Sequence, residues 1–317
     1  MRLCRYRHAN EVHAGFYFDT YIVPVDAAVR AHRAQTQHGL TPPGGKDLLP
    51  LLPGGEHSAA THALAAWLAA DVARGEGLAV PVAKVQLLTP IPQPAKIILL
   101  AGNYNEHIQE GGGRATERAK TFPYLFTKPP TTTLNHPGAP IVIPAVSPNH
   151  VDWECELGVV MGRRCKGVKE ADALSHVAGY TVVNDISDRK FRPNPGREKR
   201  EKDTFFDWQH GKWHDTFCPV GPCIASADAL RDPQQLALTL TVNGRVHQNA
   251  STAQMIFPVA AILEFVSAIV TLEPGDIIST GTPSGVGNTT GTYLQPGDRM
   301  EAAIAGIGVL HNHMVAA

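Results

Sequence analysis

The sequence has no hydrophobic run that reaches the roughly 18 consecutive apolar residues needed to span a lipid bilayer. Its first 18 residues include basic side chains, but they lack the continuous apolar stretch and small-residue cleavage site of a secretory leader. These two absences argue against a membrane protein and predict a cytoplasmic one with no membrane partner.

Charged residues are also scarce. They make up 18% of the chain, against about 25% in an average globular protein, and the formal net charge is −1. Without a strong field of one sign, we expect no nucleic-acid partner. The mixed-charge run at 197–202 is typical of a solvated helix or loop.

The five cysteines are an odd number without regular spacing, so they do not form a disulfide framework. Cys218 and Cys223 are near enough in sequence for a bridge. Free thiols in a reducing compartment are nevertheless the simpler expectation.

What is present predicts a β-rich protein. Hydrophobic residues make up 43% of the 317 residues, and 29 glycines with 25 prolines indicate many turns. We therefore expect an α+β fold. Four prolines between positions 81 and 94 favour extended chain and predict a linker near 86–95. The chain is then expected to divide into a small N-terminal α/β domain, residues 1–90, and a main domain, residues 91–317.

Hydrophobic periodicity locates the elements. A short polar helix containing His107 and Glu110 is expected before Gly111-Gly112-Gly113, which can act as a hinge. Longer helices are expected at 57–73 and 254–270, and strands at 96–100, 140–143, 151–161, 179–184, 236–242 and 276–280.

The segment 151–161 alternates apolar and acidic residues. In a strand, Asp152, Glu154 and Glu156 would share one face, because successive side chains point to opposite sides. Three like charges on one face repel each other unless something positive lies among them. A solvent-exposed sheet face is the alternative interpretation.

Asp185 ends a second apolar run, where a side chain can project into a cleft. Alone it is a weak signal, because Asn-Asp at a strand end is often a turn. With Glu154 and Glu156 it would complete a three-carboxylate site. Oxygen ligands suit Mg²⁺, Mn²⁺ or Ca²⁺ rather than Zn²⁺.

At this point residues 96–312 resemble the fumarylacetoacetate hydrolase family. The resemblance rests on these pieces in order: Gly102-Asn103-Tyr104 with His107 and Glu110; Phe126-Thr127-Lys128-Pro129; Asp152 to Leu157; Gly179-Tyr180 through Asn184-Asp185-Ile186-Ser187 with Arg189; Gly211-Lys212, Asp215-Thr216-Phe217 and Pro219-Val220-Gly221-Pro222; and Thr280 to Gly287. It implies a mixed β-sandwich roll, Mg²⁺ or Mn²⁺ held by Glu154, Glu156 and Asp185, and a homodimer. The N-terminal segment resembles the small extra domain of bacterial members.

The resemblance places the family's catalytic pair on His107 and Glu110. Their i, i+3 spacing brings both side chains to one side of a helical turn. A carboxylate beside an imidazole fixes its tautomer and raises its basicity, as a general base for water requires. Without the resemblance, two ordinary surface residues would be the simpler interpretation. The triple glycine fits a lid over the substrate.

Other family positions fall on charged and polar residues. Lys128 and Lys212 match lysines that face the active site and balance developing negative charge. Arg189 and Thr282 match positions that hold the carboxylate or oxo group of the substrate. Tyr104 is expected at the pocket wall. Asp152 lies outside the family's ligand set and is expected behind the ligands.

The predicted function is hydrolysis of a C–C bond in a β-diketo or 2-oxo acid, such as an acylpyruvate or a fumarylacetoacetate-like compound from aromatic catabolism. The reaction would use water activated by His107 and Glu110 and a metal-stabilised enolate. Tautomerisation or isomerisation of 2-hydroxymuconate-type acids and decarboxylation of oxaloacetate-type acids use the same machinery and stay open. A non-catalytic binding protein is a remote alternative. The aromatic residues among 205–213 would line the pocket or a dimer interface.

Overall fold

The protein is described by a computed structural model over residues 1–37 and 45–317. A twelve-stranded sheet follows the path β4-β3-β2-β1-β14-β12-β11-β17-β6-β7, with β5 paired to β1 and β8 to β14. A second sheet of five strands runs β16-β15-β18-β19-β9, and β10 pairs with β13 in a separate two-stranded sheet. The fold is thus a strand-rich α+β fold, as predicted.

The strands are β1 (Arg2–His8), β2 (Glu11–Tyr17), β3 (Tyr21–Pro24), β4 (Val80–Pro81), β5 (Gln86–Leu88), β6 (Ile97–Ala101), β7 (Tyr124–Thr127), β8 (Leu134–Asn135), β9 (Pro140–Ile143), β10 (Val151–Asp152), β11 (Cys155–Met161), β12 (Val177–Asn184), β13 (Ser187–Asp188), β14 (Cys218–Ser226), β15 (Ala237–Val242), β16 (Arg245–Ser251), β17 (Ile277–Ser279), β18 (Arg299–Ile304) and β19 (Gly308–Ala316). The α-helices are α1 (Val25–Thr36), α2 (Ser58–Ala69), α3 (Val72–Gly77), α4 (Asn105–Glu110), α5 (Glu170–Ala173), α6 (Asp203–His210), α7 (Val259–Ile269) and α8 (Gly287–Thr290).

The core is divided by the large sheet. Leu157 of β11 and Ile98 of β6 belong to one buried cluster, whereas Val160 and Leu99 of the same strands belong to another. This division follows from the alternation of side chains along a strand. The first cluster also contains residues of β15 and β18, so it fills the space between the two sheets. The predicted sandwich is therefore present.

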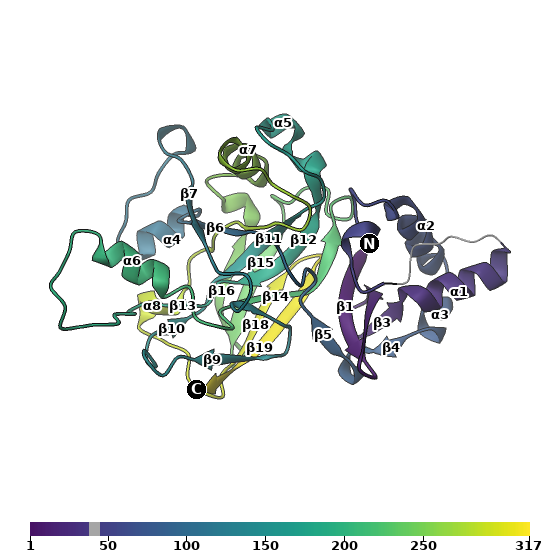
Figure 1. Ribbon diagram of the computed structural model, residues 1–317, viewed down its shortest axis with the longest axis horizontal. Helices are drawn as coiled ribbons and strands as arrows, with labels where there is room; N and C mark the ends of the chain where they lie inside the picture. Colours follow the sequence, from purple (N-terminus) through teal and green to yellow (C-terminus); the bar gives the residue numbers. More distant parts are fainter. Residues whose placement is uncertain (38–44) are drawn as a thin grey trace.

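The N-terminal region continues the large sheet. Strand β1 pairs with β14 through Arg2↔Ala225 and Leu3↔Ile224. Helices α1, α2 and α3 gather at this end, and α4, α6 and α8 lie at the opposite end (Figure 1). The proline-rich segment expected to be a linker is partly a strand, because Gln86 in β5 pairs with Arg7.

Several element boundaries differ from the expectation. Helix α7 begins at Val259, after the N-cap residue Pro258, rather than at 254. The residue Gln254 instead completes a capping box with Ser251 in a preceding 3₁₀ turn. The helix expected at 57–73 ends at Ala69, and a new helix, α3, starts after Asp71.

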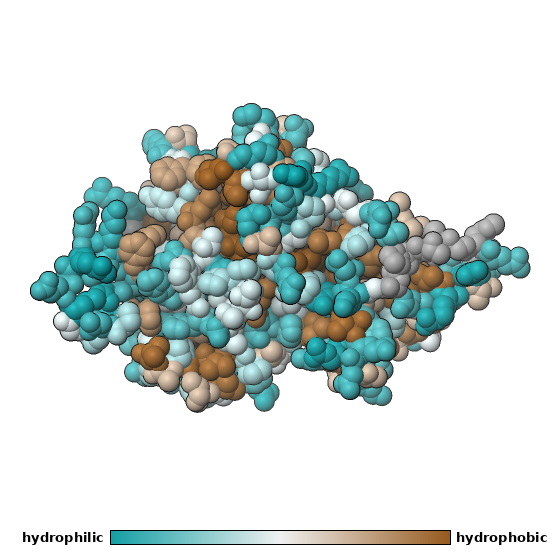
Figure 2. Space-filling model, in the orientation of Figure 1, coloured by the Kyte–Doolittle hydropathy of each residue, from teal (hydrophilic) through white to brown (hydrophobic). Residues whose placement is uncertain are grey.

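The charged run at 197–202 forms an exposed loop before α6, and hydrophilic side chains cover this end of the molecule (Figure 2). Arg197 in this loop is paired with Asp203 and Asp207 of α6. All five cysteines are free and buried. In the described part of the chain, no helix is long and apolar enough to cross a membrane.

Candidate metal centre and active site

Three carboxylates meet where β11 and β12 run side by side. Cys155 pairs with Asn184, and the backbone N–H of Asp185 donates to the Glu154 carbonyl at 2.8 Å. This register places Glu154, Glu156 and Asp185 together, with one oxygen of each within 4.8 Å of the others. All three are buried, which rules out the solvent-exposed sheet face.

The strand expected at 151–161 is interrupted. Strand β10 ends at Asp152 and β11 begins at Cys155, and the two belong to different sheets. The carboxylate of Asp152 therefore does not join the group formed by Glu154, Glu156 and Asp185. Its Oδ2 instead accepts a hydrogen bond from Arg189 Nε at 2.8 Å.

Two buried lysines neutralise the carboxylate group. Lys212 Nζ lies 2.9 Å from Glu154 Oε2 and 2.6 Å from Asp185 Oδ2. Lys128 Nζ lies 2.6 Å from Asp185 Oδ1 and also donates to two main-chain carbonyls at 2.8 and 2.7 Å. Two of the three ammonium donors of Lys128 are therefore used by the main chain, and its contact with Asp185 is an ion pair without a hydrogen bond. Lys212 also lies beside an aromatic side chain, because its Nζ is 5.7 Å from the ring centroid of Trp208.

Arg189 is the third cation of the site. Its Nη2 lies 2.5 Å from Glu154 Oε1. Burial by itself disfavours the ionised form of Glu154, but the charges of Arg189 and Lys212 hold its pKa well below the ordinary value. Burial likewise opposes the charge of Lys212, yet Asp185 and Glu154 raise its pKa. Glu154 is therefore ready to bind a cation as a carboxylate.

Glu156 has the opposite electrostatics. Burial, reinforced by the negative charges of Asp185 and Glu154, raises its pKa well above the ordinary value. Its Oε2 accepts hydrogen bonds from Ser279 Oγ at 2.5 Å and Gly281 N at 3.0 Å. Its Oε1 is buried and has no hydrogen-bond partner among the described residues. A divalent cation fits this arrangement, because it would satisfy the unpartnered oxygen and relieve the repulsion between carboxylates.

The predicted catalytic pair is assembled on α4. His107 Nδ1 lies 2.7 Å from Glu110 Oε1. Glu110 Oε2 accepts a hydrogen bond from the backbone N–H of Gly285 at 2.9 Å and one from Thr289 Oγ1 at 3.3 Å. Although burial opposes ionisation of Glu110, the hydrogen bonds from His107 and Gly285 lower its pKa. The pair is thus an imidazole held at Nδ1 by an ionised carboxylate.

A small cavity of about 60 Å³ is lined by His107 of the predicted catalytic pair and by Glu154 of the carboxylate group. Of the predicted site residues, His107, Glu154, Arg189 and Thr282 line it. The others in its lining are Leu100, Ala101, Gly102, Phe126 and Trp208. Tyr104, expected at the pocket wall, lies in the hydrophobic core and does not line this cavity. The size is well below the roughly 300–1,000 Å³ of pockets for drug-sized ligands, and it suits a compact ligand.

Sequence reasoning missed residues that hold the site together. Gln248 on β16 is fully buried, accepts from Cys155 N at 2.9 Å and donates to Thr282 Oγ1 at 2.8 Å. It thereby joins the five-stranded sheet to the start of β11. Ser279, which donates to Glu156, was also missed, although it lies within the predicted strand 276–280, directly before the segment from Thr280 to Gly287. No local signal identifies Gln248, whose partners are distant in sequence.

The comparison with known families agrees with this geometry. Residues 96–315 match the family described as "Fumarylacetoacetate (FAA) hydrolase C-terminal". The chain therefore belongs to the fumarylacetoacetate hydrolase family, as the sequence motifs predicted.

Individual relatives are enzymes with different reactions. The chain is 39% identical over 281 residues to 2,4-didehydro-3-deoxy-L-rhamnonate hydrolase of Sphingomonas sp., covering 87% of this chain and 91% of that one. It is 36% identical over 238 residues to a mitochondrial oxaloacetate tautomerase of Rattus norvegicus, covering 74% and 71%. Among solved structures, it resembles maleylpyruvate hydrolase from Sphingobium sp. SYK-6 in complex with manganese(II) and pyruvate, with a TM-score of 0.71, 31% identity and full coverage of both chains.

Proposed function

We propose that this protein is a divalent-metal-dependent hydrolase that cleaves a C–C bond in a β-diketo 2-oxo acid, such as an acylpyruvate. The observation that carries the proposal is the single small cavity lined by His107, Glu154 and Arg189, with the His107–Glu110 pair on α4 and the carboxylate group at the ends of β11 and β12. The proposed general base and one of the three carboxylates therefore line the same cavity.

Glu154, Glu156 and Asp185 would hold Mg²⁺ or Mn²⁺. When bound, the ion supplies Lewis acidity for the negative charge that develops on the 2-oxo group. The similar structure of a maleylpyruvate hydrolase with manganese(II) and pyruvate supports a site of this kind. Arg189, which lines the cavity, would bind the substrate carboxylate through Nη1, which has no partner among the described residues.

His107 would act as the general base. Its Nδ1 is engaged by Glu110, which leaves Nε2 to take a proton from water. The hydroxide attacks the carbonyl remote from the carboxylate, and the C–C bond then breaks toward the 2-oxo side. The carbon that keeps the electron pair of that bond takes up the proton that His107 removed from water, and the products are a carboxylic acid and a shorter 2-oxo acid. Lys212, which lies beside Trp208, would offset the negative charge of the oxyanion, and Lys128 would hold Asp185 in place.

The experiment is product analysis with a matched pair of variants. Acylpyruvates are incubated with the Mn²⁺-loaded protein, and the products are identified by NMR in deuterated buffer. His107→Ala is expected to lower kcat by about 10²-fold or more with Mn²⁺ affinity retained. His311→Ala, which changes an exposed histidine paired with Glu301, should leave both unchanged. Full turnover by His107→Ala on a substrate that the wild type cleaves would overturn the general-base assignment.

A second candidate is tautomerisation of a compact oxo-acid of the oxaloacetate type. Two observations favour it: the cavity of about 60 Å³, and the similarity to an oxaloacetate tautomerase. In that reaction His107 would move a proton between carbon and solvent instead of activating water. The same NMR experiment separates the candidates, since hydrolysis yields two fragments and tautomerisation yields deuterium exchange without cleavage.

A further inference from the structure

Asp152 is a fully buried carboxylate with four donors around it. Its Oδ1 accepts from the backbone N–H groups of Trp153 at 2.8 Å and Gly287 at 2.7 Å. Its Oδ2 accepts from Asn288 N at 3.0 Å and from Arg189 Nε at 2.8 Å. The three backbone donors fix the carboxylate, so the fourth contact fixes the side chain of Arg189 rather than the reverse.

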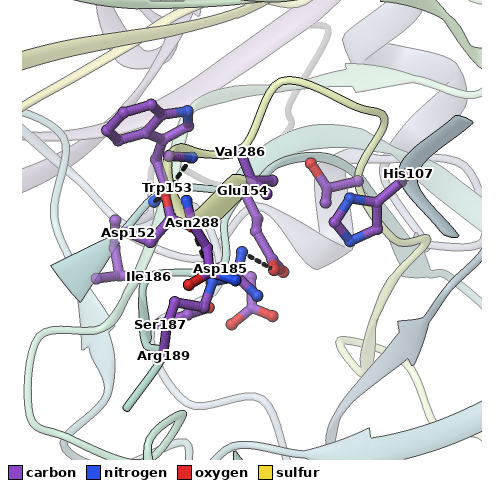
Figure 3. Close-up of polar contacts among 12 residues, drawn as sticks. His107, Asp152, Trp153, Glu154, Asp185, Ile186, Ser187, Arg189, Val286 and Asn288 are labelled. Carbon is purple, nitrogen blue, oxygen red and sulfur yellow. Dashed lines mark hydrogen bonds and ion pairs between the residues drawn. The ribbon is translucent and has the colours of Figure 1, made fainter. Parts of the chain in front are cut away.

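The guanidinium of Arg189 is consequently held along one edge. Nε faces Asp152, and Nη2 lies 2.5 Å from Glu154 Oε1. Among the described residues Nη1 has no hydrogen-bond or ion-pair partner, and the side chain lines the cavity. In Figure 3, Asp152 and Arg189 lie on one side of Glu154, and His107 lies on the other. A planar fork held in this way is preorganised for a ligand carboxylate.

The backbone around Arg189 adds a second constraint. Asp152 belongs to the short sheet formed by β10 and β13, in which it pairs with Ser187, and Arg189 directly follows β13. The Arg189 N–H also donates to the His150 carbonyl at 2.9 Å. The main-chain hydrogen bonds fix the position of the Arg189 backbone. Asp152 then determines which edge of the guanidinium points away from the cavity.

The same carboxylate is linked to the catalytic pair. The segment 285–288 donates from Gly285 N to Glu110 and from Gly287 N and Asn288 N to Asp152. The arginine edge and the Glu110 carboxylate are therefore held by one short stretch of backbone. This stretch fixes their spacing across the cavity.

We propose that Asp152 is a positioning residue that sets the orientation of Arg189 for binding the carboxylate of a 2-oxo acid. The proposal rests on the proposed function insofar as Arg189 is assigned to that carboxylate. It differs from a purely structural role, in which Asp152 would only stabilise the backbone at the start of α8 and ligand binding would be indifferent to it.

The test is a double-mutant cycle read out by pyruvate binding to the Mn²⁺-loaded protein, measured by calorimetry without turnover. Asp152→Asn keeps the shape but removes the charge and one acceptor. It is expected to weaken pyruvate binding by about 10-fold, with Mn²⁺ affinity within about 3-fold of the wild type. Arg189→Lys retains a charge but loses the Nε donor, and it should weaken pyruvate binding to a similar extent. In the Arg189→Lys background, Asp152→Asn should then cause less than about 2-fold further loss.

The matched control is Asp276→Asn. Asp276 is also fully buried, accepts hydrogen bonds from two backbone N–H groups and pairs with Lys96. It lies outside the site, because it precedes β17, whereas Ser279, which contacts Glu156, ends that strand. This control should lower thermal stability and leave pyruvate binding unchanged. If Asp152→Asn does not fold, Asn288→Pro is the second variant. It removes the backbone N–H of exposed Asn288, which donates to Asp152 Oδ2, the oxygen that also accepts from Arg189 Nε. It should weaken pyruvate binding by about 2- to 3-fold.

Additive losses in the cycle, or wild-type pyruvate binding by Asp152→Asn, would overturn the positioning role. These outcomes are independent of catalysis. A protein that binds pyruvate with the expected coupling but cleaves no oxo-acid refutes the proposed hydrolase and leaves the role of Asp152 standing.

Discussion

Lys212 Nζ lies 2.6 Å from Asp185 Oδ2, and both side chains are almost entirely buried. The ammonium therefore sits in the same field that a cation held by the three carboxylates would experience. Its positive charge lowers the repulsion between carboxylates in the metal-free protein and competes with a bound ion.

Replacement of this ammonium separates its two effects. Lys212→Met is expected to strengthen Mn²⁺ binding by about 5-fold or more, because a buried like charge is removed. It should also lower kcat by about 10²-fold, because the charge near the developing oxyanion is lost. Calorimetry and steady-state kinetics measure the two effects. Lys96→Met, which removes the partner 2.8 Å from buried Asp276, should change neither. Weaker Mn²⁺ binding by Lys212→Met would show that the lysine mainly organises the carboxylates.

The raised pKa of Glu156 predicts that metal uptake releases a proton. The protein should therefore bind Mn²⁺ more tightly as pH rises, by up to about tenfold per pH unit below that pKa. Calorimetry in buffers of different ionisation enthalpy gives the number of protons released. Glu156→Gln should abolish Mn²⁺ binding. Proton release that is absent at pH values just above 4.5 would contradict the assignment.

The same raised pKa affects the stability of the metal-free protein. Above pH 4.5, the ordinary pKa of a glutamate side chain, the folded state binds a proton at Glu156 that the unfolded state has lost. The contribution of this group to stability therefore falls as pH rises from about 4.5 to the folded-state pKa, and it stays constant beyond that pKa. Glu156→Gln should flatten this dependence in thermal melts with a chelator. A Glu156→Gln melting curve with the same pH slope as the wild type would disprove this account.

Glu110 has a lowered pKa and is ionised across the neutral range, so its charge is constant where activity is measured. A carboxylate stabilises a neighbouring imidazolium. Glu110→Gln should therefore lower kcat/KM by about tenfold or more, because His107 loses the negative charge that stabilises it once it has taken a proton. Glu117→Gln, which changes an exposed glutamate paired with Lys120, is the control and should leave kcat/KM unchanged. An unchanged kcat/KM for Glu110→Gln would contradict the pairing.

Gly285 is predicted to be the most sensitive glycine near the site. Its φ is +97°, and a Cβ there would lie 2.0 Å from the His247 carbonyl oxygen. Gly285→Ala should lower stability by more than about 2 kcal/mol and disturb Glu110, which its N–H holds. Gly291→Ala, with φ +69° and open space around it, should cost only about 1 kcal/mol. Chemical denaturation of both variants gives the comparison, and equal losses would show that backbone strain alone matters.

Much of the site could be predicted because its signals are local. The His107–Glu110 spacing on one helical turn and the alternation through Glu154 and Glu156 depend only on helix and strand geometry. The break between β10 and β11 could not be predicted, because it depends on Asp152 pairing with Ser187 in a separate sheet. The domain boundary at 90 stays a prediction, and the sheet that joins β1 to β14 adds a connection that no local pattern indicated.

The sequence by itself determined the family, and through that resemblance it predicted the three carboxylates and the His107–Glu110 pair. Only the tertiary structure decided that Lys128 binds two main-chain carbonyls beside Asp185, that Tyr104 belongs to the core, and that Asp152 accepts a hydrogen bond from Arg189. The physical reason is that burial and hydrogen-bond partners come from strands and loops far apart in the chain. The residue type gives the charge of a side chain, but tertiary packing decides which groups surround that charge.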